Sequence, residues 1–440
     1  MSMFNIGLSG LNTTQKALEV TSNNIANSGT AGYKTASTEF SAIYNNGQRS
    51  GVGVSATSEN FEKQGTLVST GQSLDLAITG KGFFVISENG RLAYTQAGQF
   101  KLDDQRNLIT NNGNQLQGYG IDDQGNLVPG VLTGLKVEAG NIPAKATETV
   151  NFSLNLNSGS PLIPYTAVFN PKDGTAFNYS QSTEVFDSLG NSHTLTQYFN
   201  HTGGNQWDVV YYMDGEPMLD TAFPAGMLSP DSPIDANNSA GTPVNNVAVV
   251  RMTFGSDGQL RPLDGTAPAL DNNVTDPSDV REFTIDFFPT GASAMSIKLD
   301  LVKSTQFGSA FGLYENNADG YTSGEFTGVS VSEDGKVLAT FSNGETKLQG
   351  QVVLANFANP QGLESANNTT WYASEQSGAA LMGVPSEGNF GAVLAGAYVG
   401  SNVDISKQLV DLMSFQQSYQ ANAKTISTAD EMMQVLFNAV

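Results

Sequence analysis

Residues 404–440, DISKQLVDLMSFQQSYQANAKTISTADEMMQVLFNAV, contain no glycine or proline and repeat one stripe at gaps that alternate between three and four. This spacing predicts a long helix that buries one face along its whole length. The stripe consists of Leu409, Leu412, Gln416, Tyr419, Ala423, Ile426, Asp430, Met433, Phe437 and Val440. Asp404 is the expected N-cap, and the helix would span ~55 Å at 1.5 Å per residue.

A weaker stripe with the same alternation lies near the other end of the chain. It predicts a helix over residues 6–25, which Gly29 and Gly32 would end. The positions are Leu8, Leu11, Gln15, Leu18, Ser22 and Ile25. The chain therefore carries a predicted amphipathic helix at each end.

Apolar residues beside the C-terminal stripe make it wider than one partner helix can cover. They are Val410, Met413, Met432 and Val435. A wide stripe indicates further neighbours, hence other copies of the chain. It predicts that the apolar faces of the terminal helices cannot be buried adequately within one molecule. An ordinary helical hairpin within one chain is the alternative. Gln416 and Asp430 interrupt the stripe, where they fix the register, face a wet channel or are simply tolerated.

The middle of the chain has the pattern of β-strands. Residues 83–87 and 91–95 flank Glu88-Asn89-Gly90, which is a strong hairpin signal. Residues 103–108 and 122–127 repeat one turn sequence. Residues 151–311 form a second strand-rich block, with a loop region rich in Pro, Asn and Ser at 217–247.

The predicted fold class is mainly β with α-helical termini: terminal coiled-coil helices, an inner β domain built from both flanks and an inserted outer β domain. The expected divisions are a terminal helical domain at residues 1–35 with 396–440, an extended connecting segment at 36–72, an inner or middle β domain at 73–150 with 312–395, and the outer domain at 151–311.

Composition restricts the possible functions. Charged residues make up 14% of the chain, the formal net charge is −22 and cysteine is absent. A surface this acidic repels phosphate backbones, so no nucleic-acid partner is expected. No stretch has the ~18 apolar residues of a membrane span, so no membrane insertion is expected. The N-terminus has no secretory signal pattern, which predicts that export, if it occurs, uses a route without a cleaved signal.

No catalytic or ligand-binding motif in the sequence defines a site. Residues 51–56 (GVGVSA) match a loose dinucleotide pattern but alternate as a strand does, and residues 315–326 resemble a calcium loop that lacks its final carboxylate. His193 and His201 sit in polar segments and are expected at the solvated surface. The sequence therefore predicts a non-enzymatic protein with no catalytic, cofactor-binding or metal residues and no cofactor.

Residues 23–34 (NNIANSGTAGYK) resemble the N-terminal signature of the flagellar rod and hook axial proteins. The residues that carry this resemblance are Asn24, Ala26, Asn27, Gly32, Tyr33 and Lys34. Residues 51–54 and 74–84 look like the segment that follows in that family, and residues 409–432 resemble its C-terminal helix. Residues 186–195, in the insertion, are similar to the outer domain of the hook members.

The resemblance implies a structural subunit of the bacterial flagellar hook. Such a subunit polymerises into a flexible curved tube that encloses the export channel and transmits torque from rod to filament. Leu8, Leu11, Leu18 and Ile25 and the C-terminal stripe would then be assembly positions. The implied partners are the chain itself, the distal rod protein, the hook cap protein, the hook-filament junction protein and the flagellar type III export apparatus. The implied location is extracellular, in the hook.

Two other readings stay open. One is a distal rod subunit of the same apparatus, which the long central insertion argues against. The other is a secreted carbohydrate-active or adhesive β protein, which would leave the matched terminal helices unexplained.

Overall fold

The structure is a computed structural model. It describes residues 2–438 except 46–47, 123, 139, 164–167, 225–227, 230–231, 233, 239 and 263–280, and within helices and strands it leaves out a few side chains, those of 436–438 among them. The chain is mainly β with a helix at each end, as the sequence predicts. Its contacts divide it into two compact units: residues 1–140 with 326–440, and residues 141–325. This division groups residues 141–150 and 312–325 with the insertion.

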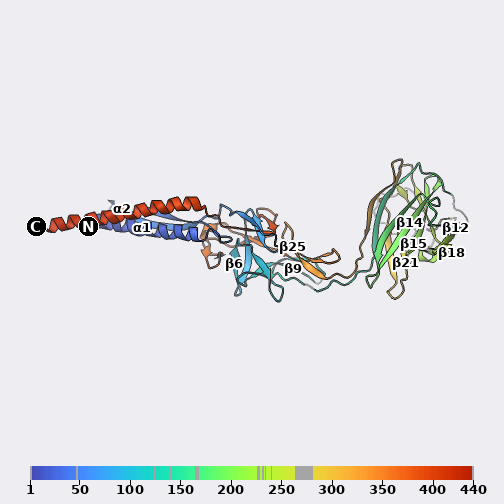
Figure 1. Ribbon diagram of the computed structural model, residues 1–440, viewed down its shortest axis with the longest axis horizontal. Coiled ribbons are helices and arrows are strands. Elements are labelled where there is room, and N and C mark those ends of the chain that lie inside the picture. Colours follow the sequence, from blue (N-terminus) through green and yellow to red (C-terminus); the bar gives the residue numbers. More distant parts are fainter. Residues whose placement is uncertain are drawn as a thin grey trace. The chain divides into compact units, whose positions relative to one another are not determined.

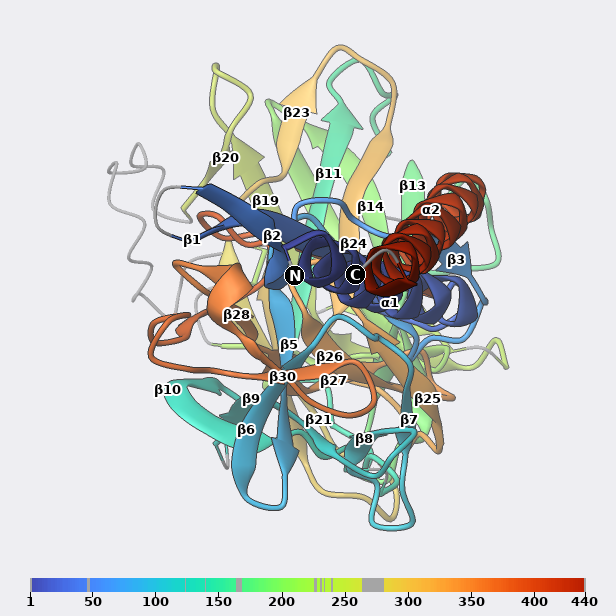
Figure 2. The ribbon, with the colours of Figure 1, turned by 90° about the vertical axis from the view of Figure 1, so that its left-hand side faces the viewer.

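Helices α1 (Ser2–Ala26) and α2 (Ile405–Asn438) lie side by side in unit 1 (Figures 1 and 2). Asp404 caps α2, because its carboxylate accepts a hydrogen bond from the backbone N–H of Lys407 at 3.1 Å. The chain turns away after Ala26 through bonded turns, and Gly32 adopts a positive φ of 70°. Both predicted helices are therefore confirmed.

A large antiparallel sheet forms the body of unit 1. Its main path runs β25 (Phe326–Val331), β26 (Lys336–Phe341), β27 (Thr346–Val352), β9 (Gln115–Ile121), β5 (Phe83–Glu88), β6 (Arg91–Thr95), β30 (Thr370–Tyr372) and β29 (Glu364–Ser365). Strands β7 (Phe100–Leu102), β8 (Leu108–Thr110), β10 (Leu127–Gly134), β28 (Leu354–Asn356) and β31 (Leu381–Gly383) pair off this path. Two short pairs complete it: β3 (Leu67–Ser69) with β33 (Ala397–Val399), and β4 (Leu76–Thr79) with β32 (Ala392–Ala395). Both flanks of the sequence thus build one domain.

The predicted hairpin of strands β5 and β6 is present. Asn89 and Gly90 adopt φ values of 51° and 83°, which is the type I′ turn that matches the twist of the two strands. The hairpin carries Phe83 and Tyr94 into a buried aromatic cluster, where both rings contact Phe357. This cluster forms part of the hydrophobic core of the β domain.

The connecting segment forms a long hairpin of β1 (Ala36–Asn45) and β2 (Gln48–Glu59). It packs against the helix pair, because Phe40 contacts Phe415 of α2 edge to face and the Ser9 hydroxyl of α1 accepts a hydrogen bond from the backbone N–H of Val52 at 3.2 Å. The connecting segment is therefore part of the helical end and not only a linker.

Unit 2 is built from two packed sheets and a small third one. The first holds β21 (Glu282–Phe287), β22 (Met295–Asp300), β11 (Thr149–Asn157), β23 (Thr305–Phe307) and β24 (Gly312–Ala318). The second holds β13 (Tyr179–Phe186), β14 (Ser192–Gly203), β15 (Gln206–Met213), β19 (Val249–Phe254) and β20 (Leu260–Arg261), with β16 (Glu216–Pro217) at β15. The third holds β12 (Val168–Phe169), β17 (Ile234–Asn237) and β18 (Pro243–Val247), two of which lie within the predicted loop region 217–247 and correct that expectation. Short 3-10 helices cover Asp220–Ala222 here and Pro360–Gly362 in unit 1.

The core of unit 2 lies between its two larger sheets, and both contribute to it. Phe152 of β11 stacks on Phe199 of β14, with Trp207 and Tyr211 of β15 fully buried beside them. The expectation of two solvated histidines is wrong, because His201 is buried and the side chain of His193 is only 15% exposed. The Nδ1–H of His201 donates to the Ser160 carbonyl at 2.9 Å, and its ring stacks on Trp207, the residue directly opposite on β15.

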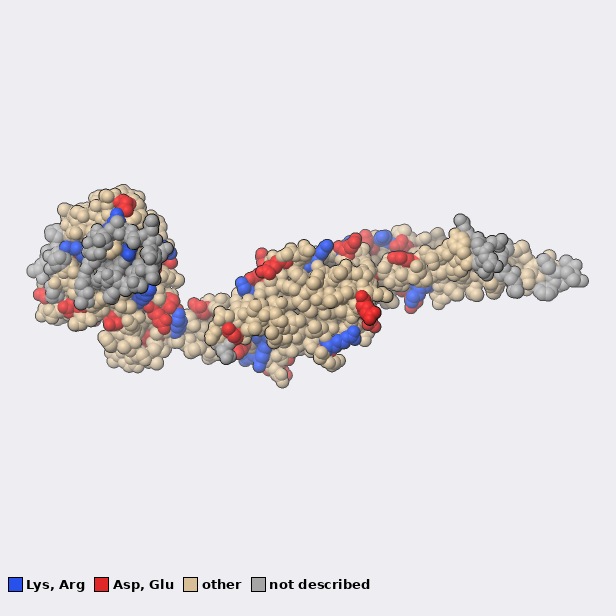
Figure 3. Space-filling model, turned by 180° about the vertical axis from the view of Figure 1, so that it is seen from behind, with Lys and Arg blue, Asp and Glu red and all other residues tan. Residues whose placement is uncertain are grey.

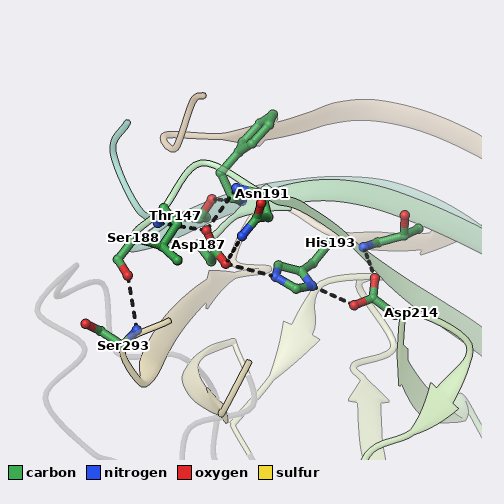
Figure 4. Close-up of polar contacts among 10 residues, drawn as sticks. Thr147, Asp187, Ser188, Asn191, His193, Asp214 and Ser293 are labelled. Atoms are coloured by element: carbon green, nitrogen blue, oxygen red, sulfur yellow. Dashed lines mark hydrogen bonds and ion pairs between the residues drawn. The ribbon is translucent and has the colours of Figure 1, made fainter. Parts of the chain in front are cut away.

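Asp187 organises the turn between β13 and β14 (Figure 4). Its carboxylate accepts hydrogen bonds from the backbone N–H groups of Leu189 and Asn191 at 2.8 and 2.9 Å and from the Asn191 amide at 2.9 Å. The ring of His193 lies between Asp187 and Asp214, with Nδ1 2.6 Å from the Asp214 carboxylate. Burial alone would raise the pKa of Asp187, but these hydrogen bonds outweigh it and lower the pKa to about 2.

Asp187→Ala is expected to destabilise unit 2 by about 1–3 kcal/mol at neutral pH, because it leaves part-buried N–H groups without acceptors. The folded pKa lies below the ordinary value of 3.8, so the carboxylate's contribution is complete above about pH 4 and is lost as the pH falls toward 2. The difference in the free energy of unfolding between wild type and variant should therefore vanish over that pH range.

Urea unfolding in a Trp371→Phe background isolates unit 2, since Trp207 and Trp371 are the two tryptophans and each unit holds one. Asp173→Ala is the matched control, because Asp173 caps the same kind of turn from an exposed position. An equal loss in both variants, or a gap that stays constant down to pH 2, would contradict the role given to Asp187.

Candidate assembly interface

Small and polar residues of α1 form its buried face. They are Gly7, Gly10, Thr13, Thr14, Ala17, Thr21 and Asn24. A Cβ added at Gly7 would lie 2.9 Å from Ile426, and one added at Gly10 would lie 2.8 Å from the Asn422 side chain. The lack of a side chain at these two positions lets the helix backbones approach closely. Because Asn24 meets Gln408 near the other end, the two helices run antiparallel.

The predicted α1 stripe lies one residue away from this buried face. Leu8 is exposed, while Leu11, Leu18 and Ile25 are half-buried. On α2, Ile426 contacts α1, whereas Leu412, Tyr419 and Ala423 are half-buried. Leu409, Gln416, Asp430 and Met433 are exposed, and the side chains of Phe437 and Val440 lie outside the described residues.

The residues that widen the C-terminal stripe are all exposed. Val410 is 61% exposed and Met413 is 55% exposed, with Met432 and Val435 exposed as well. The expectation that the apolar faces of the terminal helices cannot be buried adequately within one chain therefore needs a correction. An intramolecular helix pair forms through the small residues, and it leaves the larger apolar residues of both helices on its outside. Most of the helix pair in the view of Figure 3 is also uncharged.

Asn24 ties α1 to both α2 and the connecting hairpin. It is 1% exposed, and its amide group donates to the Gln408 side chain at 2.9 Å and to the Ala36 carbonyl at 2.8 Å. Its side-chain oxygen accepts hydrogen bonds from the Ala36 N–H at 3.0 Å and the Tyr33 hydroxyl at 3.1 Å. Every hydrogen-bonding group of this buried amide is used, which fixes the direction of the chain as it leaves the helix.

Asn402 makes a second junction, at a position that no sequence pattern marks. Its side-chain oxygen accepts hydrogen bonds from the backbone N–H and the hydroxyl of Thr35, both at 2.7 Å. Its amide donates to the carbonyls of Asn60 and Lys63, both at 2.8 Å. One buried side chain thereby joins the segments before β1, after β2 and before α2. No spacing pattern links these positions, so the sequence alone carried no signal for it.

The other residues of the N-terminal motif have different surroundings. Ala26 is the exposed last residue of α1, and the Asn27 side chain accepts a hydrogen bond from the Thr30 hydroxyl at 3.1 Å. Gly32 combines its positive φ with a backbone approach to Ala97, where a Cβ would lie 2.5 Å from the amide nitrogen. Burial raises the pKa of Tyr33. Lys34 is buried at the edge of a cavity in the β domain.

The two segments that resemble ligand-binding motifs, residues 51–56 and 315–326, have other roles in the structure. Residues 51–56 lie within strand β2. In the calcium-like segment, the carboxylate of Asp319 already accepts the Lys145 ammonium at 2.7 Å and the backbone N–H groups of Glu148 and Thr149 at 2.9 Å. Among the described residues, no group of three or more His, Cys, Asp or Glu side chains is arranged to hold a metal ion. None of the helices in the described ranges is both long and apolar enough to span a membrane.

Four family models match the chain in succession. Residues 4–34 match "Flagella basal body rod protein" and residues 77–155 match "Flagellar hook protein FlgE/F/G D1 domain". Residues 155–321 match "Flagellar basal body protein FlaE D2 domain" and residues 395–439 match "Flagellar basal body rod FlgEFG protein C-terminal". All four descriptions are of flagellar basal-body, rod or hook proteins. The paired terminal helices and the two β units therefore define an axial subunit of the bacterial flagellum.

Whole-chain similarity narrows this class. The chain is 35% identical to the flagellar hook protein FlgE of Escherichia coli (strain K12) and to that of Salmonella typhimurium, with 99% of each chain covered. It is 28% identical to the FlgE of Borreliella burgdorferi, covering 98% of this chain and 97% of the other. The chain belongs to the flagellar hook protein family.

Family membership defines the protein's role. It is a structural, non-enzymatic subunit of the extracellular flagellar hook and forms a homopolymer within the flagellum. The matches include the inserted domain, and this favours a hook subunit rather than a rod subunit.

Proposed function

We propose that the apolar outer faces of α1 and α2 hold the copies together. The observation that carries this proposal is that the predicted leucine stripe of α1 lies one residue away from the small-residue face through which α1 pairs with α2. The helices pair through Gly7 and Gly10, so Leu8, Val410 and Met413 remain outside. Exposed apolar residues along the outside of a helix pair are typical of an association surface. The exposed members of the predicted stripes at 8–25 and 409–437 then lie between copies, around an export channel.

The same reading gives each unit a layer in the tube. The terminal helices form the inner layer, the β domain of both flanks forms the middle layer, and the insertion forms the outer one. With 14% charged residues, contacts between outer domains are mostly neutral hydrogen bonds, which contribute about 0.5–1.5 kcal/mol each and exchange readily with water. Such contacts let neighbours slide, so the tube bends as a universal joint while it transmits torque from rod to filament.

The remaining partners follow from position in the flagellum. We propose that the ends of the tube meet the distal rod protein and the hook-filament junction protein, that the hook cap protein covers the growing end, and that the type III apparatus exports the chain. Export without cleavage is supported by α1, since residues 2–26 supply half of the helix pair and their removal would expose the buried face of α2.

Val410→Asp tests the proposed interface. It is expected to raise the concentration needed for tube formation at least about tenfold, because a carboxylate buried without a partner costs several kcal/mol. Leu381→Asp is the matched control, since Leu381 is 65% exposed against 61% for Val410 and lies on β31, outside the helices. Sedimentation and electron microscopy give the measurement. The proposal fails if the two variants assemble alike.

A further inference from the structure

The β domain of unit 1 holds a cavity of about 520 Å³ beside Lys34. One wall is aromatic and is formed by Phe61, Phe83 and Phe357. The ring of Phe83 contacts the other two edge to face. The turn between β4 and β5 and the segment after β28 close it from two sides, and Lys34 and Lys81 line it. The lining thus combines an apolar wall with two cationic side chains and one acidic residue, Glu62, which is exposed to solvent.

Lys34 is buried there without an adequate partner. It is 3% exposed, and the hydrogen bond from its Nζ to the Lys63 carbonyl is 3.5 Å long. That carbonyl already accepts a hydrogen bond from the Asn402 side-chain amide at 2.8 Å. Among the described residues, Lys34 forms no ion pair. Burial lowers its pKa to about 8, and the more distant carboxylate of Glu59 opposes this effect without cancelling it.

An ammonium group has three N–H donors, so most of the hydrogen-bonding capacity of Lys34 is unused. Four of the side-chain amides that line the cavity already donate to backbone carbonyls: those of Gln64, Gln96, Asn359 and Gln361. The chemistry that fits is therefore a carboxylate on a short apolar stem, with its charge on Lys34 and its stem against the aromatic wall.

We propose that this cavity receives an aspartate or glutamate side chain from a second copy of the chain and that its carboxylate pairs with Lys34. The inference rests on the proposed polymer. Each copy carries 42 acidic residues against 20 basic ones, so every copy offers surplus carboxylates. Lys34 adjoins Thr35, which Asn402 holds, so the pair would fasten a neighbouring copy to the helix junction itself.

Lys34→Met tests the pair, because methionine keeps an unbranched stem and removes the charge. It is expected to raise the concentration for tube formation at least about tenfold, since truncating one partner of a buried charge pair leaves the other unpaired. In dilute solution the variant should unfold at the same temperature as wild type or higher, because it removes an unpaired buried ammonium. A structural lysine would instead show a lower unfolding temperature in the dilute variant.

Lys347→Met is the matched control, since Lys347 pairs with Glu138 at an exposed position. Zero-length carbodiimide cross-linking of tubes grown from mixed ¹⁴N and ¹⁵N chains identifies the partner by mass spectrometry. We expect Lys34 joined to an acidic residue of the other isotope. Wild-type tubes in which Lys34 is joined to no other copy would overturn this inference and leave the polymer standing.

Two further outcomes are decisive. If wild type forms no tubes, the proposed function fails and the inference fails with it. If N-acetylglutamate stabilises the dilute chain through Lys34 but tubes give no cross-link there, the cavity takes a free carboxylate and the second-copy proposal is wrong.

Discussion

Deleting residues 405–440 is expected to abolish tube formation completely while both β units remain folded. Helix α2 supplies Leu409, Val410 and Met413 of the outer face and also covers the small-residue face of α1. Without α2, α1 has no partner for Gly7 and Gly10, and an isolated helix of this kind is marginal in water. The deletion therefore removes both the pair and the surface that the pair presents.

Electron microscopy and sedimentation detect the loss of tubes, and the two tryptophans report separately on the two units. Trp371 is buried in the aromatic cluster of unit 1 and Trp207 in the core of unit 2. We expect both to show cooperative unfolding in the truncated chain. Tubes formed by that chain would contradict the assembly role, and a missing Trp371 transition would mean that α2 chiefly supports the β domain.

Asn402→Leu is expected to destabilise unit 1 by about 2–4 kcal/mol. The substitution leaves the Thr35 N–H and the Asn60 carbonyl without their side-chain partner, and each such unsatisfied group costs about 1–3 kcal/mol. Urea unfolding followed by Trp371 in a Trp207→Phe background measures the loss.

Asn402→Asp separates the two halves of the amide. It keeps the acceptor for Thr35 and loses the donors to Asn60 and Lys63, so its stability should fall between wild type and Asn402→Leu. Asn111→Leu is the control, since Asn111 is exposed. If Asn402→Leu costs no more than the control, Asn402 does not hold the junction.

Both helices, the β5–β6 hairpin and the nested order of domains could be predicted from the sequence, because each rests on local spacing or turn chemistry. The leucine stripe of α1 stood out by its apolar character. The face that pairs the helices, which includes Gly7, Gly10 and Ala17, has the same three-and-four spacing one residue earlier. Its physical basis is close backbone approach, which a count of apolar residues does not detect. Small residues at heptad spacing were the available signal.

Other features depend on contacts between distant parts of the chain. Asn402 joins residues more than three hundred positions away, and His201 is buried because Trp207 lies opposite it across two paired strands. The length of Lys34's hydrogen bond and the cavity beside it likewise emerge only when residues 34, 63 and 357 come together. Such surroundings have no local pattern, so they could not be predicted from the sequence.

Methionine oxidation tests the central claim most directly, because Met413 and Met432 lie on the exposed face of α2 while Met252 is buried in unit 2. Peroxide treatment followed by mass spectrometry should oxidise Met413 and Met432 in the dilute chain and protect both in assembled tubes, with Met252 protected in each state. Tubes in which Met413 and Met432 oxidise as fast as in the dilute chain would show that this face stays open to water, which contradicts its role as the contact between copies.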